Sequence, residues 1–205
     1  MTVDPQSVKH QDIYKLMIGA IVPRPIALVS TVSHDGVLNL APFSFFTGIS
    51  SKPPLICFCP GPRSDPGPRK DTLINISRTM EFVVNIVSEE IAEAMNLTSG
   101  EYPPETDEFK VAELTPIPSD LVKPPRVAES PVSMECRLRL AIEFSEEPGG
   151  GNLVIGAILR FHVDERVISE NLRIDPDKLR AVGRLGGPTG YTRTRDRFDM
   201  VRPKV

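Results

Sequence analysis

Residues 132–145 alternate between apolar and polar side chains with a period of two, and this pattern restricts the fold more than any other feature of the sequence. The apolar side chains of one face are those of Val132, Met134, Cys136, Leu138, Leu140, Ile142 and Phe144. Alternation of this kind is typical of a strand in an antiparallel sheet that has one face on the core. We therefore predict a long strand here, with its even-numbered side chains buried.

A second long strand is expected at residues 152–168, joined to the first through the glycine-rich turn 147–151. One face is apolar throughout, and we expect it to be core: Leu153, Ile155, Ala157, Leu159, Phe161 and Val163. The other face holds Gly156, Ile158, Arg160 and His162. His162 is therefore predicted to point away from the core, either to solvent or into a ligand groove.

Shorter elements precede these two strands. Residues 25–33 and 37–41 flank Asp35-Gly36, a strong hairpin signal, and three further apolar runs are short enough to be central strands: 45–51, 55–59 and 82–87. Helices are expected at 12–18, 72–78, 88–98 with Ser88 as its cap, and 177–181. Short strands joined by hairpins leave no room for the helices that a parallel sheet requires, so the pattern favours a closed or nearly closed antiparallel barrel.

Proline is frequent, with 21 residues, and clusters at 53–54, 60–68 and 116–131. Because proline cannot donate to a sheet ladder, these clusters mark rigid loops between elements. They do not separate regions of different composition. We expect a single domain over 1–205, with a polar N-terminal tail of about 1–10 and a C-terminal tail of about 192–205.

Charge and composition exclude several classes of protein. The net charge is −3 and no basic stripe is visible, which argues against a nucleic-acid partner. No apolar run approaches the ~20 residues of a membrane helix, and the N-terminus lacks the apolar core of a signal peptide, so a cytoplasmic location is expected. The cysteines Cys57, Cys59 and Cys136 are expected to be reduced and buried. No metal site is expected, because the histidines lie far apart in the sequence.

Two segments have compositions that suit ligand binding. In residues 24–46, small and hydroxyl residues alternate with apolar ones across the hairpin, and such groups can line the edge of a flat polar heterocycle. The alternative is an ordinary hairpin with its small polar side chains in solvent. Residues 63–72 form a glycine- and proline-rich loop that ends at a helix start. An anion is favoured there by free amides, the helix dipole and two cations; the alternative is a solvated loop in which Asp71 only caps the helix.

Together these segments resemble the flavin reductase-like, FMN-binding split-barrel family. The matching motifs are RPIALVSTVS at 24–33, Gly36, NLAPFSFF at 39–46, SSKPP at 50–54, RKDT at 69–72, EFVVNIV at 81–87 and GRLGGPTGY at 183–191. The resemblance extends from about residue 11 to 195, and the combination of NLAPFSFF with RKDT is specific to the family.

The resemblance implies a mainly β fold, a six-stranded antiparallel Greek-key barrel with a few peripheral helices, that forms a homodimer and binds FMN. By position in the motifs, the isoalloxazine and ribityl parts of FMN are expected to contact Thr31, Asn39, Ala41, Phe43 and Ser44. The phosphate is expected at Arg69, Lys70 and Thr72, with Asp71 orienting the helix start. Tyr191 is expected either to cover the ring or to pin the C-terminal tail. His162 is a candidate catalytic residue that steers a nicotinamide or donates a proton, with a surface histidine as the alternative.

The resemblance therefore implies an FMN-dependent oxidoreductase. Electrons would come from NADH or NADPH as a transient co-substrate and pass through FMN to free flavin, a partner monooxygenase or a small acceptor. The sequence has no G-x-G-x-x-G after a strand, so a Rossmann domain for the nicotinamide is not expected. Two alternatives remain open: an electron carrier similar to flavoredoxin, with a redox-protein partner, and a protein that stores or senses FMN without turnover.

Overall fold

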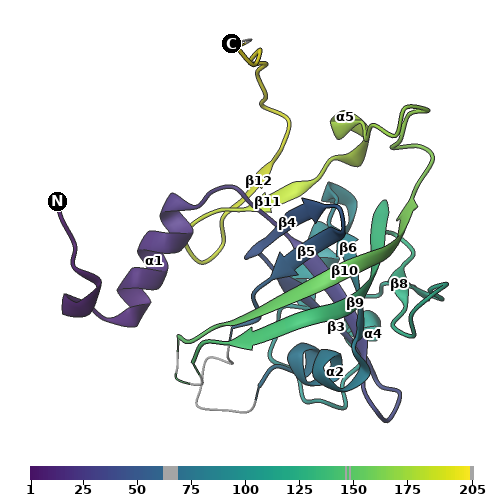
Figure 1. Ribbon diagram of the computed structural model, residues 1–205, viewed down its shortest axis with the longest axis horizontal. Helices are drawn as coiled ribbons and strands as arrows, with labels where there is room; N and C mark the ends of the chain where they lie inside the picture. Colours follow the sequence, from purple (N-terminus) through teal and green to yellow (C-terminus); the bar gives the residue numbers. More distant parts are fainter. Residues whose placement is uncertain (62–68, 146, 148, 204–205) are drawn as a thin grey trace.

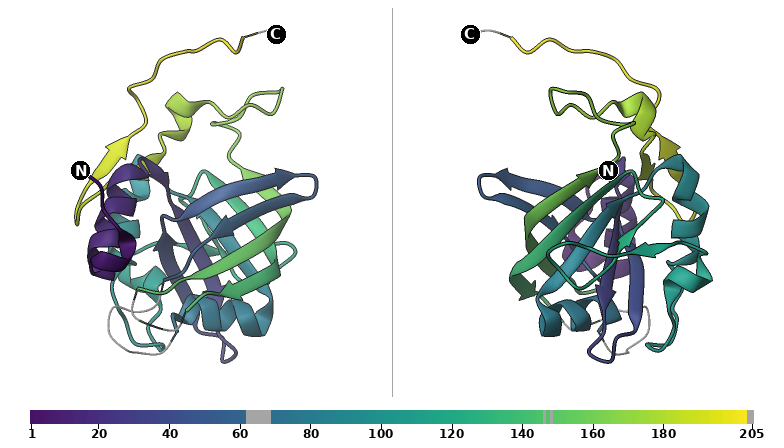
Figure 2. Two further views of the ribbon diagram at one scale, coloured as in Figure 1. Left: turned by 60° about the vertical axis from the view of Figure 1, so that its left-hand side comes forward. Right: turned by 90° about the vertical axis from the view of Figure 1, so that its right-hand side faces the viewer.

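The centre of the fold is an antiparallel sheet that curls into a split barrel, seen in the computed structural model of residues 1–61, 69–145, 147 and 149–203 (Figures 1 and 2). Among these residues the sheet has seven strands in the order β3-β2-β6-β9-β10-β5-β4. Their bounds are β2 Ala27–Val32, β3 Leu38–Phe43, β4 Phe46–Ser51, β5 Pro54–Phe58, β6 Glu81–Ile86, β9 Val132–Glu143 and β10 Asn152–Val163. The predicted mainly β split barrel is confirmed, with one strand more in the sheet than the resemblance implies.

The hairpin of β2 and β3 forms where the Asp35-Gly36 signal predicted it, and Gly36 has the positive φ of 85° that such a tight turn requires. Residues 45–51 were expected to form a central strand, and this expectation is wrong. They form β4, which lies at the edge of the sheet and is exposed along nearly its whole length. An apolar run of this length does not by itself distinguish a central strand from an edge strand.

Smaller elements surround the barrel. Two small sheets contain β1 Arg24–Pro25 with β11 Val182–Arg184 and β12 Tyr191–Arg193, and β7 Pro116–Ile117 with β8 Arg126–Val127. The helices are η1 Pro5–Ser7, α1 His10–Ala20, α2 Asp71–Thr79, η2 Glu89–Ile91, α3 Ala92–Leu97, α4 Glu108–Val111 and α5 Pro176–Leu179. The expected helix 88–98 is divided between η2 and α3, and the Ser88 side chain makes no capping hydrogen bond. The helix α4 was not predicted.

The two long strands are present, but the faces predicted for them are partly wrong. In β9, Val132, Met134 and Cys136 are buried as predicted. Beyond a β-bulge opposite Ile155 and Gly156, the remaining even-numbered side chains turn outward, and Leu140 and Phe144 are 48% and 67% exposed. One extra residue in a strand reverses the phase of every later side chain.

Between Asn152 and Ile158 of β10 the predicted core face points outward, and Val154 on the opposite face is fully buried. A register shift between Ile158 and Arg160 then reverses the phase, so that Phe161 pairs with the buried Met134 although it is itself 55% exposed. Gly156 faces inward so closely that a Cβ on it would lie 2.3 Å from Cζ of Phe82. Because both faces of 152–158 are largely apolar, the sequence period did not distinguish inside from outside there.

Two apolar clusters hold the barrel and its helices together. The first fills the barrel around Phe43, Phe58 and Phe82, and α2 packs Leu73 and Ile76 into it. The second lies between the other face of the β2–β3 hairpin and the helices η2, α3 and α4. The first residues of α2 and of α4 are therefore held against the same hairpin. None of the three cysteines forms a disulfide. No helix within the described residues is long and apolar enough to cross a membrane.

Candidate functional site

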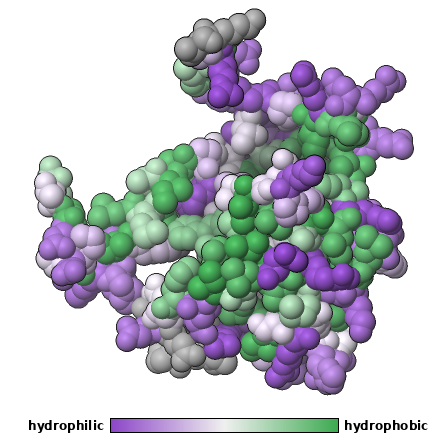
Figure 3. Space-filling model, viewed as in Figure 1, coloured by the Kyte–Doolittle hydropathy of each residue, from purple (hydrophilic) through white to green (hydrophobic). Residues whose placement is uncertain are grey.

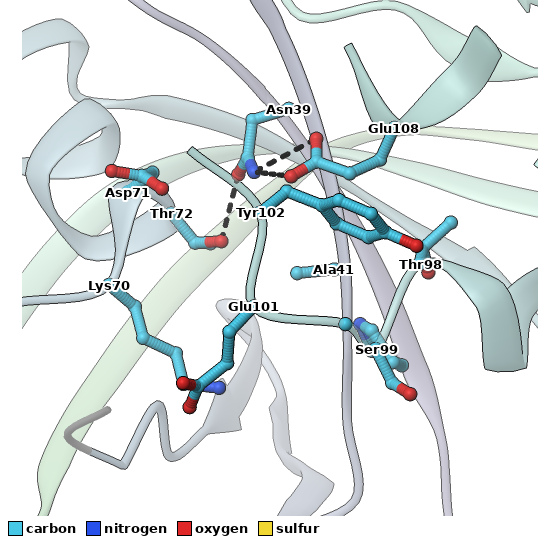
Figure 4. Close-up of a pocket in the computed structure, with 12 residues that line it drawn as sticks. Asn39, Ala41, Lys70, Asp71, Thr72, Thr98, Ser99, Glu101, Tyr102 and Glu108 are labelled. Carbon is cyan, nitrogen blue, oxygen red and sulfur yellow. Dashed lines mark hydrogen bonds between the residues drawn. The ribbon is translucent and has the colours of Figure 1, made fainter. Parts of the chain in front are cut away.

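A pocket of about 160 Å³ opens where the start of α2, strand β3, the segment after α3 and helix α4 meet (Figure 4). Its lining residues are Asn39, Ala41, Pro42, Lys70, Asp71, Thr72, Thr98, Ser99, Gly100, Glu101, Tyr102 and Glu108. The RKDT and NLAPFSFF motifs thus reach the same pocket although about 30 residues separate them, because α2 packs against the β2–β3 hairpin.

The wall of the pocket is a buried polar network centred on Asn39. The Asn39 amide nitrogen donates to both carboxylate oxygens of Glu108, at 3.2 Å each, and its Oδ1 accepts from the hydroxyls of Thr31, at 3.0 Å, and Thr72, at 2.9 Å. Asn75 Nδ2 donates to Thr31 Oγ1 at 3.0 Å. All five residues are buried, and no buried side-chain nitrogen or oxygen within the described residues lacks a hydrogen-bond partner.

Charges of both signs line the pocket. Lys70 precedes the first residue of α2, and its Nζ lies 5.8 Å from the ring centroid of Phe43. In Figure 4 the Lys70 side chain and the Glu101 side chain point toward one another across the mouth. Burial raises the pKa of the Glu108 carboxyl, and Asp71 nearby adds to that effect. A lysine beside the start of a nine-residue helix favours an anion, whereas the carboxylates favour the hydroxyl donors of a polyol.

Of the residues predicted to bind the cofactor, five line the pocket: Asn39, Ala41, Lys70, Asp71 and Thr72. Thr31 lies behind the pocket wall with no exposed surface, and Phe43 belongs to the barrel core. Part of the predicted phosphate loop, residues 62–68, lies outside the described residues.

The other predicted contacts lie outside this pocket. Ser44 Oγ accepts from Arg24 Nε at 3.2 Å, and Arg69 Nη2 lies 2.6 Å from Glu143 Oε2. The Tyr191 hydroxyl donates to Asn96 Oδ1 at 3.1 Å, which places this residue at the end of α3. Roles for these residues as cofactor contacts stay predictions.

His162 points away from the barrel interior, as its position in the strand predicted, but it does not line the pocket. Its Nε2 lies 2.5 Å from Oε1 of the fully buried Glu135, which also accepts from the backbone N–H groups of Asp120 and Leu121. Burial is the largest single effect on Glu135 and raises its pKa, but the hydrogen bonds from the Asp120 N–H, His162 and the Leu121 N–H together outweigh it, and the pKa is lowered.

Asp120, Glu135 and His162 have the donor types of a metal site, with His162 Nε2 4.0 Å from Asp120. However, Asp120 is paired with Arg160 at 2.6 Å, and the Glu135 oxygens are already satisfied by hydrogen bonds. The contacts therefore describe a hydrogen-bonded cluster that holds the 120–121 segment on the sheet.

The sequence did not reveal Glu108, Asn75 or the 98–102 segment as parts of this site. Asp107 caps α4 by accepting from Phe109 N at 3.1 Å, and this Asx cap is a local signal that could have located the helix. Nothing in the local sequence distinguishes Glu108 from an ordinary exposed glutamate in a first helical turn. Its burial depends on contacts with β3, 68 and 69 residues away.

Comparison with known proteins identifies relatives that cover nearly the whole chain. An uncharacterized protein of Aquifex aeolicus is 45% identical over 88% of this chain and 91% of its own length. Nitrilotriacetate monooxygenase component B from Bacillus cereus is similar in structure, with a TM-score of 0.91 and 37% identity over 98% of each chain.

Two further solved structures are informative. Pseudomonas fluorescens 2-nitrobenzoate 2-nitroreductase NbaA has a TM-score of 0.88 and 34% identity over 99% of this chain and 96% of that one. Flavoredoxin of Desulfovibrio vulgaris shares the fold, with a TM-score of 0.75 and 23% identity over 88% of this chain and 91% of its own. Residues 18–183 match the model of the flavin reductase like domain, and the chain therefore belongs to that family.

Proposed function

We propose that this protein is an FMN-dependent oxidoreductase that passes electrons from a reduced nicotinamide through the flavin to free flavin, a partner oxygenase or a small acceptor. The observation that carries the proposal is the meeting of the NLAPFSFF and RKDT motifs at one pocket, in a chain that is 37% identical to a monooxygenase component B over 98% of its length. A cytoplasmic location is part of the proposal.

The pocket suits the phosphate and ribityl part of a flavin mononucleotide. Lys70 and the start of α2 supply positive charge for a phosphate, and the carboxylates and Thr72 supply acceptors for ribityl hydroxyl groups. At about 160 Å³ the pocket is smaller than the ~300–1,000 Å³ typical of sites that enclose a whole ligand, so it would hold the phosphate and ribityl part of FMN with the ring outside it.

The bound flavin would supply the hydride and electron chemistry, and the residues of this chain would hold it and leave one face of the ring accessible. NADH or NADPH would then bind transiently against the flavin. The similarity to a 2-nitrobenzoate nitroreductase supports a small acceptor, and the similarity to component B supports a partner oxygenase. Among the residues outside the pocket, His162 and Tyr191 are the candidates for contact with the nicotinamide or the ring.

A homodimer is also proposed. Large apolar side chains at the end of β9 and just after it are exposed, among them Leu140, Ile142 and Phe144, and apolar side chains gather on this side of the molecule in Figure 3. Contiguous exposed apolar surface of this kind is typical of protein interfaces. Light scattering tests the proposal: a flavin-loaded monomer would exclude a cofactor site that depends on the dimer.

The experiment that tests the function is an absorbance spectrum of the purified protein with added FMN, followed by anaerobic addition of NADH or NADPH. We expect flavin bands that bleach with the nicotinamide. Bands that persist with nicotinamide but bleach with a reduced redox protein would identify an electron carrier similar to flavoredoxin. Bands that neither donor bleaches would indicate storage or sensing, and failure to bind FMN would refute the proposal.

A further inference from the structure

Both polar atoms of the Asn39 side-chain amide are engaged inside the pocket wall. Its nitrogen donates to Glu108, and its oxygen accepts from Thr31 and from Thr72, as described above. Both threonine hydroxyls and the Asn75 amide belong to the same connected set, drawn from β2, β3, α2 and α4. The direction in which each proton points is therefore coupled to the direction of all the others.

Glu108 sets that direction. An ionised carboxylate can only accept hydrogen bonds, and Glu108 receives them from Asn39 Nδ2 and from the backbone N–H of Leu40, at 3.0 Å. A protonated Glu108 would place an O–H against these donors, so the contacts fit the ionised form. Asn39 must then direct its nitrogen toward Glu108 and its oxygen toward the two threonines, and both hydroxyls must donate to that oxygen.

The orientation of the Asn39 amide determines whether the Thr72 hydroxyl can donate or only accept a hydrogen bond in the pocket. Thr72 lines the pocket, but its single hydroxyl proton is committed to Asn39 Oδ1, so only its oxygen lone pairs are available to a ligand. The oxygens of a phosphate dianion are acceptors and gain no hydrogen bond from such a group. Ionised Glu108 also adds a negative charge to the lining of the same pocket.

We propose that Glu108 is a positioning residue that keeps the Thr72 hydroxyl proton directed toward Asn39. It thereby lowers the affinity of the pocket for a phosphate monoester. The inference rests on the proposed function and deepens it. The flavin would be held loosely enough to exchange, as a protein that hands reduced flavin to another acceptor requires.

The test compares FMN with riboflavin, which lacks the phosphate, using quenching of flavin fluorescence on binding. In Glu108→Gln the glutamine amide can accept from Leu40 N and donate to Asn39, whose amide then rotates, and Asn75 can rotate in the same way. The Thr72 hydroxyl becomes free to donate to the phosphate. We expect FMN to bind about 10-fold more tightly or better, the gain of one charge-assisted hydrogen bond, with riboflavin nearly unchanged.

The variant Thr72→Val separates this mechanism from simple removal of a charge. If the hydroxyl carries the gain, Glu108→Gln tightens FMN in the wild-type background and leaves affinity within about 3-fold in the Thr72→Val background, since coupled residues are non-additive. A gain that persists in Thr72→Val would overturn the inference, because it would then be a pure charge effect. Weaker FMN binding by a folded Glu108→Gln protein would also overturn it.

Thr72→Val alone gives a second test that does not require Glu108→Gln to fold. Because the hydroxyl proton is already committed inward, we expect this substitution to change the ratio of FMN affinity to riboflavin affinity less than about 3-fold, far below the loss of a charge-assisted bond to the phosphate. A loss of ~10-fold or more that is confined to FMN would refute the inference. Failure of the wild type to bind either flavin would instead refute the proposed function, so the two failures are distinguishable.

Discussion

Replacement of Gly156 by alanine tests which face of β10 is inside. A Cβ built on Gly156 lies 2.3 Å from Cζ of Phe82 and 3.0 Å from its Cε1. The Phe82 ring is fully buried and packs edge-on against Phe58, with centroids 5.5 Å apart, so it has little room to move. Overpacking of a filled core costs ~1–3 kcal/mol, and this contact is severe enough to place the loss of unfolding free energy at about 2–3 kcal/mol.

If the other face of β10 were inside, the change in unfolding free energy caused by Gly156→Ala would have the opposite sign. If the odd-numbered residues of β10 were inside, alanine at 156 would face outward and would stabilise the fold by ~0.4–1 kcal/mol through the unfolded chain. Because the sequence has no tryptophan, urea unfolding is best followed by far-UV circular dichroism. With a slope of ~1–3 kcal/mol per molar urea, a 2–3 kcal/mol loss lowers the midpoint by about 1 M or more.

Gly48→Ala is the matched control, since Gly48 lies on the edge strand β4 and an added Cβ would meet no atom within 4 Å. It should leave stability unchanged or slightly raised. In addition, Phe82→Leu should partly relieve the cost of Gly156→Ala, because the two residues are in contact and their effects are not additive. A stabilising or neutral Gly156→Ala, or strict additivity with Phe82→Leu, would refute the reasoning.

The remaining predictions concern charged groups. Lys70→Ala should weaken FMN at least ~10-fold and riboflavin little, because only FMN carries the anion, and equal weakening measured by fluorescence would contradict a phosphate contact. Hydrogen bonds from Arg195, Arg180 and Arg193 lower the pKa of Glu89 from 4.5 to about 2. The stabilisation of the C-terminal segment by Glu89 is therefore fully present above pH 4.5 and is lost as the pH falls toward 2. Hydrogen exchange of residues 191–197 can follow this loss. The same pH dependence in Glu89→Gln would exclude Glu89 as its cause. His162→Ala should lower the free energy of unfolding by about 1–3 kcal/mol, since it leaves a buried carboxylate at Glu135 without its side-chain partner. Unchanged stability with slower flavin reduction would instead assign His162 to catalysis.

Several elements of the barrel could be predicted because their causes are local. The hairpin turn at Asp35-Gly36 requires a residue that accepts positive φ, and the chain supplies glycine there. Period-two alternation identified β9 and β10 as strands, and the helical expectation at 72–78 falls within α2. The NLAPFSFF and RKDT motifs likewise named five of the twelve residues that line the pocket.

The sequence by itself therefore determined the class of fold, the hairpin and the motifs that meet at the pocket, since each depends on residues close together in the chain. Tertiary structure alone decided the rest. A bulge in β9 and packing against Phe82 decided which apolar faces are core, because a period of two defines two faces but does not say which is inside. The burial of Glu108 depends on β3, which is 68 and 69 residues away in the sequence. Only the folded barrel brings the Glu108 carboxylate to the two groups that donate hydrogen bonds to it, the Asn39 amide and the Leu40 N–H.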